Sequence, residues 1–243
     1  MTLDIFGEQP KLAILIDPDH SEEENFEVLL DHLSLGLTDI VLIGGSTTRV
    51  VDIDHIVRRV KSRCPSPVYL FPGSALQISK YADGLLLPSL ISGRNPTYLI
   101  GKHVEAARLL KKSNIKIISM GYILIEGGKM STTSYVTNTL PIPSHLPDLA
   151  ADTALAGQFL GLRCIYLEAG SGASRPVDME LISKVKEQIT IPLIVGGGIT
   201  TPDQLVLARE SGADMVVLGS VLEERPDEII SFHKAWSSQV PIR

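Results

Sequence analysis

Short apolar runs alternate with amphipathic stretches along the whole chain, and this repeat restricts the possible folds more than any other feature. Eight runs predict strands, at 12–16, 39–43, 68–71, 84–87, 115–119, 164–167, 193–195 and 215–218. Few polar residues interrupt them, as expected for parallel strands that are buried on both faces. Eight strand–helix repeats within 243 residues predict a (β/α)8 barrel, the TIM-barrel form of the α/β class. The alternative is an open, doubly wound sheet.

The stretches between the runs predict the helices. Helical segments are expected at 26–33, 53–60, 98–112, 148–160 and 181–189, and a last helix runs to about Trp236. Two capping boxes predict helix starts, one with Ser21 and Glu24 and one with Thr201 and Gln204. We expect eight helices and, because no linker interrupts the repeat, a single domain over 1–243.

One segment breaks the periodicity. Residues 127–144 are rich in Ser and Thr and show no helical or strand pattern. A loop of this length in a compact domain is usually a functional lid or a disordered segment.

Composition excludes several classes of protein. The chain carries 22 basic and 28 acidic residues, a net charge of −6 without a basic run, so we expect no nucleic-acid binding. Its two cysteines make no disulfide framework. The first ten residues do not resemble a signal peptide, and the uncharged stretches are too interrupted to cross a membrane. We therefore expect a soluble, cytoplasmic enzyme.

The active site of a (β/α)8 barrel lies at the carboxyl ends of its strands, and two glycine-rich turns fall there. Gly197 and Gly198 follow the seventh run, and Gly219 and Ser220 follow the eighth. Glycines let backbone N–H groups approach an anion, and helix N-termini nearby add positive potential. The pair of turns favours a phosphate site, although the glycines could also serve only to make tight turns.

Acidic and hydroxyl side chains follow two other strands. Asp17 comes after the first run, where a carboxylate and substrate phosphate oxygens could hold Mg²⁺. Asp19 is either a second ligand or an acid in the first turn of a helix. Ser46, after the second run, offers a hydroxyl to the metal or the phosphate, or is an ordinary turn residue.

A carboxylate directly follows the sixth run and, in a barrel, points into its mouth. Glu168 is therefore a candidate general base or hydroxyl ligand, and the alternative is an exposed loop acid. Tyr166 lies two residues earlier and faces the same side of the strand, so both can touch one ligand.

Other polar residues are weaker candidates. His20, His103 and His145 lack the spacing of zinc ligands, and the lysines do not follow strands, so we expect neither a zinc site nor a Schiff base. Arg94 and Lys102 could meet an anionic group or simply begin a solvated helix.

Several motifs together resemble one family. The run Tyr-Leu-Glu-Ala-Gly-Ser-Gly-Ala at 166–173 is the most specific, and the other matching segments are 15–19, 43–46, 92–96, 139–143, 196–199 and Gly219. In these segments the chain resembles, over nearly its whole length, the geranylgeranylglyceryl phosphate synthases. These are ether-lipid enzymes of archaeal type whose bacterial relatives include heptaprenylglyceryl phosphate synthase.

The resemblance implies a chemistry and a set of site residues. It implies Mg²⁺-dependent transfer of a polyprenyl group, expected to be geranylgeranyl, from its diphosphate to the C3 hydroxyl of sn-glycerol 1-phosphate. This reaction forms the first ether bond of an archaeal-type lipid. Asp17 and Ser46 would hold the metal, and Glu168 and Tyr166 would be catalytic. The implied glycerol phosphate contacts are Tyr166, Leu167, Glu168, Ala169, Gly170, Ser171, Gly172, Gly197, Gly198, Gly219 and Ser220. The family often has Lys in place of His20, and Asn or Thr in place of Ser220.

The resemblance also implies partners, and it leaves rivals open. We expect a homo-oligomer that makes transient contact with a membrane surface. The prenyl tail needs an apolar groove, for which Phe71, 85–87, Leu90 and Ile91 are candidates, although most of these are expected to pack the core. The rivals are another phosphate-binding barrel of the isomerase or aldolase type, and a non-catalytic module that binds glycerol phosphate or a prenyl chain.

Overall fold

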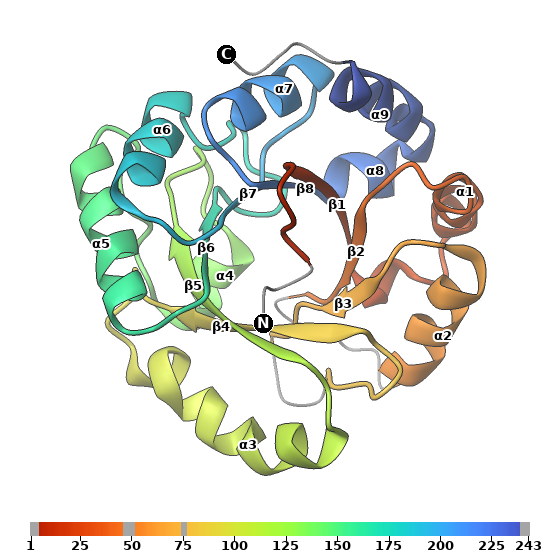
Figure 1. Ribbon diagram of the computed structural model, residues 1–243, viewed down its shortest axis with the longest axis horizontal. Helices are drawn as coiled ribbons and strands as arrows, with labels where there is room; N and C mark the ends of the chain where they lie inside the picture. Colours follow the sequence, from red (N-terminus) through yellow and green to blue (C-terminus); the bar gives the residue numbers. More distant parts are fainter. Residues whose placement is uncertain (1–4, 46–51, 74–76, 239–243) are drawn as a thin grey trace.

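The computed structural model describes residues 5–45, 52–73 and 77–238, and its strands close into one parallel barrel (Figure 1). Each strand pairs with the next along the chain, and β8 pairs with β1. The strands are β1 (Lys11–Ile16), β2 (Ile40–Ile43), β3 (Val68–Leu70), β4 (Gly84–Leu90), β5 (Ile117–Leu124), β6 (Cys164–Glu168), β7 (Leu193–Gly196) and β8 (Met215–Leu218). The predicted (β/α)8 barrel is confirmed.

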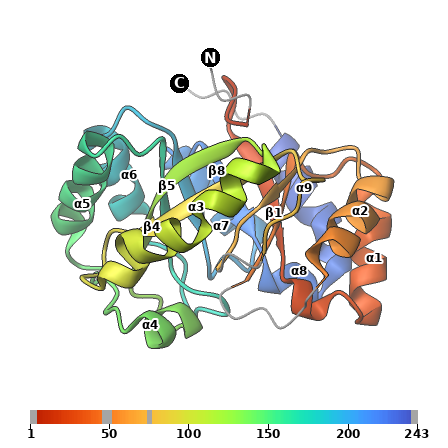
Figure 2. The same ribbon diagram turned by 90° about the horizontal axis from the view of Figure 1, so that it is seen from below.

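Most of the helices form an outer ring around the barrel (Figure 1). They are α1 (Glu24–Leu33), α2 (Ile53–Arg63), α3 (Lys102–Ser113), α5 (Pro147–Phe159), α6 (Met179–Gln188), α7 (Pro202–Glu210) and α9 (Ile229–Ser237). The shorter α4 (Thr132–Thr137) and α8 (Ser220–Glu224) lie at the end of the barrel opposite the red N-terminal segment (Figure 2). Single turns occur at η1 (Pro18–His20), η2 (Thr97–Gly101) and η3 (Pro226–Glu228).

Strand periodicity sorts the core into two apolar clusters. Alternate residues such as Ala13, Met120 and Tyr166 fill the barrel, and their neighbours pack outward against the helices. Ile5 and Phe6 join the inner cluster, both at most 5% exposed, and cover its amino-terminal end. The functional site is therefore expected at the opposite end of the barrel, at the carboxyl ends of the strands.

The two predicted capping boxes have different outcomes. Thr201 and Gln204 form theirs at the start of α7. The one at Ser21 is wrong: α1 begins at Glu24, and no side chain caps it. The chain first makes the turn η1, because Asp17 accepts a hydrogen bond from the Asp19 N–H and Pro18 favours the first position of a helical turn.

Strands β4 and β5 both run further than their apolar patterns predict, to Leu90 and Leu124. Pro88 interrupts β4, but its missing N–H would face β3, whose last pair with β4 is Leu70 with Leu85. No ladder bond is therefore lost there, and β4 continues against β5 as far as the pair of Leu90 with Tyr122.

The stretch between β3 and β4 departs from regular alternation. Its described residues, 71–73 and 77–83, contain no helix, in contrast to the predicted helix after every strand. The segment 127–144, in turn, is not without structure, because it contains α4, whose first turn is capped by the Ser131 side chain on the Ser134 N–H. Among the described residues, no helix is long and apolar enough to span a membrane.

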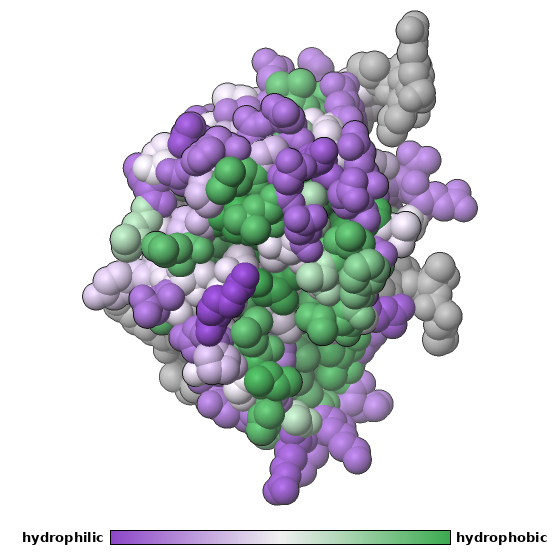
Figure 3. Space-filling view, turned by 90° about the vertical axis from the view of Figure 1, so that its left-hand side faces the viewer, coloured by the Kyte–Doolittle hydropathy of each residue, from purple (hydrophilic) through white to green (hydrophobic). Residues whose placement is uncertain are grey.

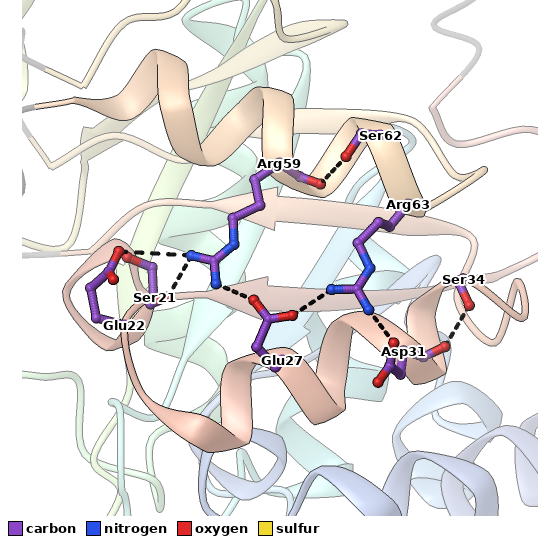
Figure 4. A network of polar contacts seen from close by, with 8 residues as sticks. All are labelled: Ser21, Glu22, Glu27, Asp31, Ser34, Arg59, Ser62 and Arg63. Carbon is purple, nitrogen blue, oxygen red and sulfur yellow. Dashed lines mark hydrogen bonds and ion pairs between the residues drawn. The ribbon is translucent and has the colours of Figure 1, made fainter.

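A surface network of ion pairs joins α1 to α2 (Figure 4). Glu27 lies between Arg59 and Arg63, and Arg63 also contacts Asp31. The two guanidinium groups hold the pKa of Glu27 below its ordinary value. Arg59 also donates to the Ser21 carbonyl over 2.9 Å, which ties α2 to the segment that follows η1. Each pair is solvated, so the network orients these helices more than it stabilises them.

Candidate active site

A cavity of about 460 Å³ opens at the carboxyl ends of the strands. It has a polar part next to β6, β7 and β8 and an apolar part next to β3, β4 and α3. Of the residues predicted from the sequence to bind the metal or glycerol phosphate or to act in catalysis, those that line it are Asp17, Tyr166, Glu168, Ser171, Gly172, Gly197, Gly198, Gly219 and Ser220. The fold thus brings together candidates that lie up to 203 positions apart.

Glu168 is the last residue of β6 and is only 6% exposed, so it is not an exposed loop acid. Its Oε1 accepts a hydrogen bond from the Gly170 N–H over 2.6 Å. The hydroxyls of Tyr166 and Tyr122 donate to the same carboxylate. The carboxylate is therefore oriented by one backbone donor and two side-chain donors.

Burial raises the pKa of Glu168 above its ordinary value, and the hydrogen bonds from Gly170, Tyr166 and Tyr122 only partly offset this effect. A carboxylate with a raised pKa is a stronger base, which suits proton abstraction near neutral pH. Burial also raises the pKa of both tyrosines well above the ordinary value, so their hydroxyls stay protonated.

The glycines at the end of β7 are required by the side chains of β6. A Cβ on Gly196 would lie 2.1 Å from the Tyr166 hydroxyl, and one on Gly197 would lie 2.3 Å from Glu168 Oε1. Gly197 also has a φ of +81°, a conformation that side chains disfavour. These glycines therefore make room for the buried pair, a role distinct from both a phosphate cradle and a simple turn.

Small polar groups face the cavity beside this pair. The Ser171 and Ser220 hydroxyls lie 2.9 Å apart and join the β6 loop to the start of α8. A Cβ on Gly172 or Gly219 would meet no atom closer than 3.8 Å, so the space next to both is open. Hydroxyl and backbone donors in an open pocket are suited to an anionic group.

Asp17 directly follows β1, which pairs with β8, so it lies next to α8. Its Oδ1 accepts from the Asp19 N–H, and its own N–H donates to Glu223 Oε1, both over 3.0 Å. A Cβ on Gly45 would lie 2.6 Å from Asp17 Oδ2, so the glycine leaves room for the carboxylate. Burial raises the pKa of Asp17 and of Glu223.

The structure does not place a second metal ligand beside the Asp17 carboxylate among the described residues. Ser46 lies outside the described residues. Asp19 is exposed in the first turn of η1 and does not line the cavity, as expected for a first-turn acid. The described part of the chain holds no cluster of three His, Cys, Asp or Glu residues that could bind a metal.

Three residues of the 166–172 stretch do not line the cavity. Leu167 and Ala169 point outward into the cluster between strands and helices. The N–H of Gly170 is already bonded to Glu168. Their contact with glycerol phosphate stays a prediction, and only backbone atoms remain to make it.

The apolar part begins where β3 ends and β4 continues. The last pair of β3 with β4 is Leu70 with Leu85, and beyond it the cavity extends between β4 and α3. Its apolar lining includes Phe71, Ile78, Leu85, Leu87, Leu90, Ala106 and Leu110. Leu86 and Ile91 pack in the core instead, as expected for some of the groove candidates.

The lysine and histidine side chains that line the cavity have partners within the protein. Lys102 pairs with Glu105 over 2.9 Å, and His103 Nε2 lies 3.0 Å from the Pro88 carbonyl. His20 lies 2.6 Å from Glu23, which raises the pKa of its imidazole. These three residues line the cavity, whereas Arg94 bonds to the carbonyl of Gly93 and does not.

Among the cavity-lining residues that sequence reasoning missed are Tyr122 and Glu223. Tyr122 lies beyond the predicted end of the fifth strand, and Glu223 lies in α8, after a predicted phosphate turn. The alternation of Met120, Tyr122 and Leu124 is the signal that could have found Tyr122.

A closed barrel with a buried carboxylate and glycine turns at the carboxyl ends of its strands is typical of barrel enzymes that bind phosphate esters. Residues 4–235 match the PcrB family. The geranylgeranylglyceryl phosphate synthase of Spirosoma linguale is 46% identical over 88% of this chain and 86% of that protein. The geranylgeranylglyceryl phosphate synthase of Thermococcus gammatolerans is 42% identical over 87% of this chain and 83% of that protein. The chain therefore belongs to the PcrB family, and it is an enzyme, a prenyltransferase.

A solved structure agrees with this assignment. The (S)-3-O-geranylgeranylglyceryl phosphate synthase of Thermoplasma acidophilum, in complex with sn-glycerol-1-phosphate, superposes with a TM-score of 0.88. It is 31% identical, and the match covers 97% of each chain.

Proposed function

We propose that the protein transfers a polyprenyl group, expected to be geranylgeranyl, from its diphosphate to the C3 hydroxyl of sn-glycerol 1-phosphate. The observation that carries the proposal is the shape of the cavity: a buried, oriented carboxylate in a polar pocket opens directly onto an apolar groove. The reaction needs these two environments side by side. The likeness to a synthase solved with sn-glycerol-1-phosphate supports the choice of acceptor.

In the proposed mechanism, Glu168 accepts the proton of the C3 hydroxyl. The hydroxyl oxygen forms a bond to C1 of the prenyl group as the bond from C1 to the diphosphate oxygen breaks, and diphosphate leaves with its electron pair. The donor pair Tyr166 and Tyr122 keeps Glu168 aimed at the hydroxyl. Ser171, Ser220 and the open turns at Gly172 and Gly219 would hold the acceptor phosphate.

The residues fit Mg²⁺, which we propose as the cofactor. Asp17 supplies a hard carboxylate that lines the cavity, and Gly45 leaves space around its Oδ2. One protein carboxylate with substrate phosphate oxygens and water is a usual arrangement for Mg²⁺, and Ser46 is the proposed hydroxyl ligand. When bound, the metal would offset the charge on the leaving diphosphate.

The apolar groove between β4 and α3 would take the prenyl tail. Leu85, Leu87 and Leu90 come from the strand, and Ala106 and Leu110 come from the helix. A Schiff-base aldolase finds less support. Among the described lysines only Lys102 lines the cavity, and its amine is paired with Glu105.

We further propose that the chain forms a homo-oligomer and touches membranes transiently. Apolar side chains gather on the face that carries α3, α4 and α5 (Figure 3). Strongly exposed examples are Val104 at 69%, Tyr135 and Phe159 at 78%, and Leu140 at 85%. Exposed apolar groups in such number are typical of interaction surfaces. Sedimentation with and without lipid vesicles tests both proposals, and a location in the cytoplasm stays a prediction.

A prenyl-transfer assay on the purified protein tests the proposed reaction. It combines sn-glycerol 1-phosphate, Mg²⁺ and polyprenyl diphosphates from C15 to C35, with sn-glycerol 3-phosphate and EDTA as controls. A magnesium-dependent ether from the 1-phosphate is expected, and the preferred donor reports the tail length. Binding of glycerol phosphate without turnover of any donor would instead favour the non-catalytic module.

A further inference from the structure

Tyr122 holds a central place in the site. It is the register partner of Tyr166 on the neighbouring strand, and it is 9% exposed inside the barrel. The centre of its ring lies 5.3 Å from that of Tyr166 and 5.8 Å from that of Phe71. The ring is thus fixed by aromatic packing, which leaves the hydroxyl as the group with freedom to serve the site.

The Tyr122 hydroxyl makes two hydrogen bonds. It donates to the carboxylate of Glu168, and it accepts from the hydroxyl of Thr133 in α4. Because burial raises the pKa of the phenol well above its ordinary value, the hydroxyl stays protonated and remains a donor.

The three donors to Glu168 come from two parts of the fold. Gly170 and Tyr166 belong to β6 and the loop after it, so they are fixed to the same segment as Glu168 itself. Tyr122 is the donor that comes from another strand. It therefore fixes the carboxylate relative to β5 and, through Thr133, relative to α4.

Helix α4 also lines the cavity. Thr133, Val136 and Thr137 all border it, so a ligand that fills the cavity contacts the helix that supports Tyr122. The base and this helix are thus joined by a chain of two hydroxyl groups.

We propose that Tyr122 is a positioning residue that aims the Glu168 carboxylate and, through Thr133, couples its orientation to the seating of α4. This proposal rests on the proposed role of Glu168 as the base. Tyr122 touches neither reacting atom, so its effect is on turnover rather than on acceptor binding.

The test removes the hydroxyl and keeps the ring. Tyr122→Phe is expected to lower kcat by about 10- to 100-fold, the cost of a misplaced catalytic group, with the KM for sn-glycerol 1-phosphate changed by less than about threefold. Tyr69→Phe is the matched control, because Tyr69 is a barrel-interior tyrosine, 5% exposed, that does not line the cavity. It is expected to leave kcat unchanged.

Two further variants separate positioning from packing. Thr133→Val is expected to lower kcat by about 3- to 10-fold, and Thr133→Ser, which keeps the hydroxyl, is expected to restore it. In the Glu168→Gln background, Tyr122→Phe is expected to have no further effect, because the group that it positions is gone.

The outcomes separate this inference from the proposed function. A wild-type protein that makes no prenyl ether overturns both, since Glu168 then has no proton to accept. If the wild type is active, two results overturn the role of Tyr122 alone. One is a kcat of Tyr122→Phe that matches that of Tyr69→Phe. The other is a double variant, Glu168→Gln with Tyr122→Phe, whose loss of kcat is the product of the two single losses.

Discussion

The two halves of the cavity are built in opposite ways. The polar half lies where β6, β7 and β8 stay paired to their ends, with Glu168 opposite Gly196 in the register. Its side chains fit so closely that Gly196 and Gly197 have no room for a Cβ. The apolar half lies where β3 stops and β4 continues unpaired on that side, so its space comes from an interruption of the barrel.

Because of this contrast, we expect the two halves of the cavity to tolerate substitutions differently. In the polar half a displacement of about 1 Å moves a catalytic group out of its productive geometry, so single atoms matter. In the apolar half the contacts are non-directional and roughly proportional to area, so side chains can vary in size as long as the space remains. We therefore expect substitutions in the polar half to affect turnover and those in the apolar half to affect the choice of donor.

Replacing the proposed base has the largest expected effect. Glu168→Gln keeps the shape and most hydrogen bonds of a 6% exposed side chain but cannot accept a proton. We expect kcat to fall by about 10³-fold, within the usual contribution of general base catalysis, with little change in the KM for glycerol phosphate. Steady-state kinetics with saturating donor measure both constants, and wild-type turnover in this variant would rule out the base role.

Crowding that base is expected to have the next largest effect. Gly197→Ala places a methyl group against Glu168 Oε1 and strains a backbone with φ of +81°, so kcat/KM should fall by about 10²-fold. Gly161→Ala is the matched control, because Gly161 has a φ of +84° and a Cβ there meets nothing within 4 Å. It should cost stability alone, and equal losses of activity in both variants would refute the steric argument.

The sequence predicts more of the polar half of the cavity than of the apolar half. The eight apolar runs predict every strand and the ends that carry Asp17, Glu168 and Gly197. They do not predict Tyr122, because Ser119 and Gly121 break the apolar pattern, while the pairing of β5 with β4 and β6 carries the strand on to Leu124. Pairing between strands depends on their neighbours, and a single segment does not contain that information.

The sequence does not predict the groove either. Residues such as Leu85 and Leu87 have the same pattern whether a helix covers them or an open space does. Only the early end of β3 and the position of α3 distinguish these cases. Similarly, Leu167 matches the family motif in sequence, but side chains alternate along β6, so Leu167 points away from the cavity.

A larger side chain in the groove is expected to change the donor preference by about tenfold. Ala106 is 5% exposed and lines the groove, so Ala106→Phe should fill the space that long tails need. Relative kcat/KM for the longest donors should drop, while the calorimetric Kd of sn-glycerol 1-phosphate stays within about twofold. Ala107→Phe, on the exposed side of the same helix, is the control. An unchanged preference would place the tail elsewhere.

The smallest expected effect concerns stability, and it follows from the raised pKa of Glu168. A carboxyl whose pKa is higher in the folded state favours folding when it is protonated, and this contribution is lost as the pH rises through the folded-state pKa. Near pH 8 the wild type therefore carries the cost of a buried charge, which Glu168→Gln does not. The variant should melt a few degrees higher there, at about 2–4 °C for each kcal/mol in a chain of this size.

The pH dependence of this difference separates the charge from the other effects of the substitution. Altered hydrogen bonds to Gly170, Tyr166 or Tyr122 would shift the Tm equally at all pH values, whereas the cost of ionisation disappears near the ordinary Glu pKa of 4.5. The Tm advantage of Glu168→Gln should therefore shrink between pH 8 and pH 4.5 in calorimetric scans. An advantage that is constant with pH would mean that the pKa is not raised, and that the polar half orients its base without making it more basic.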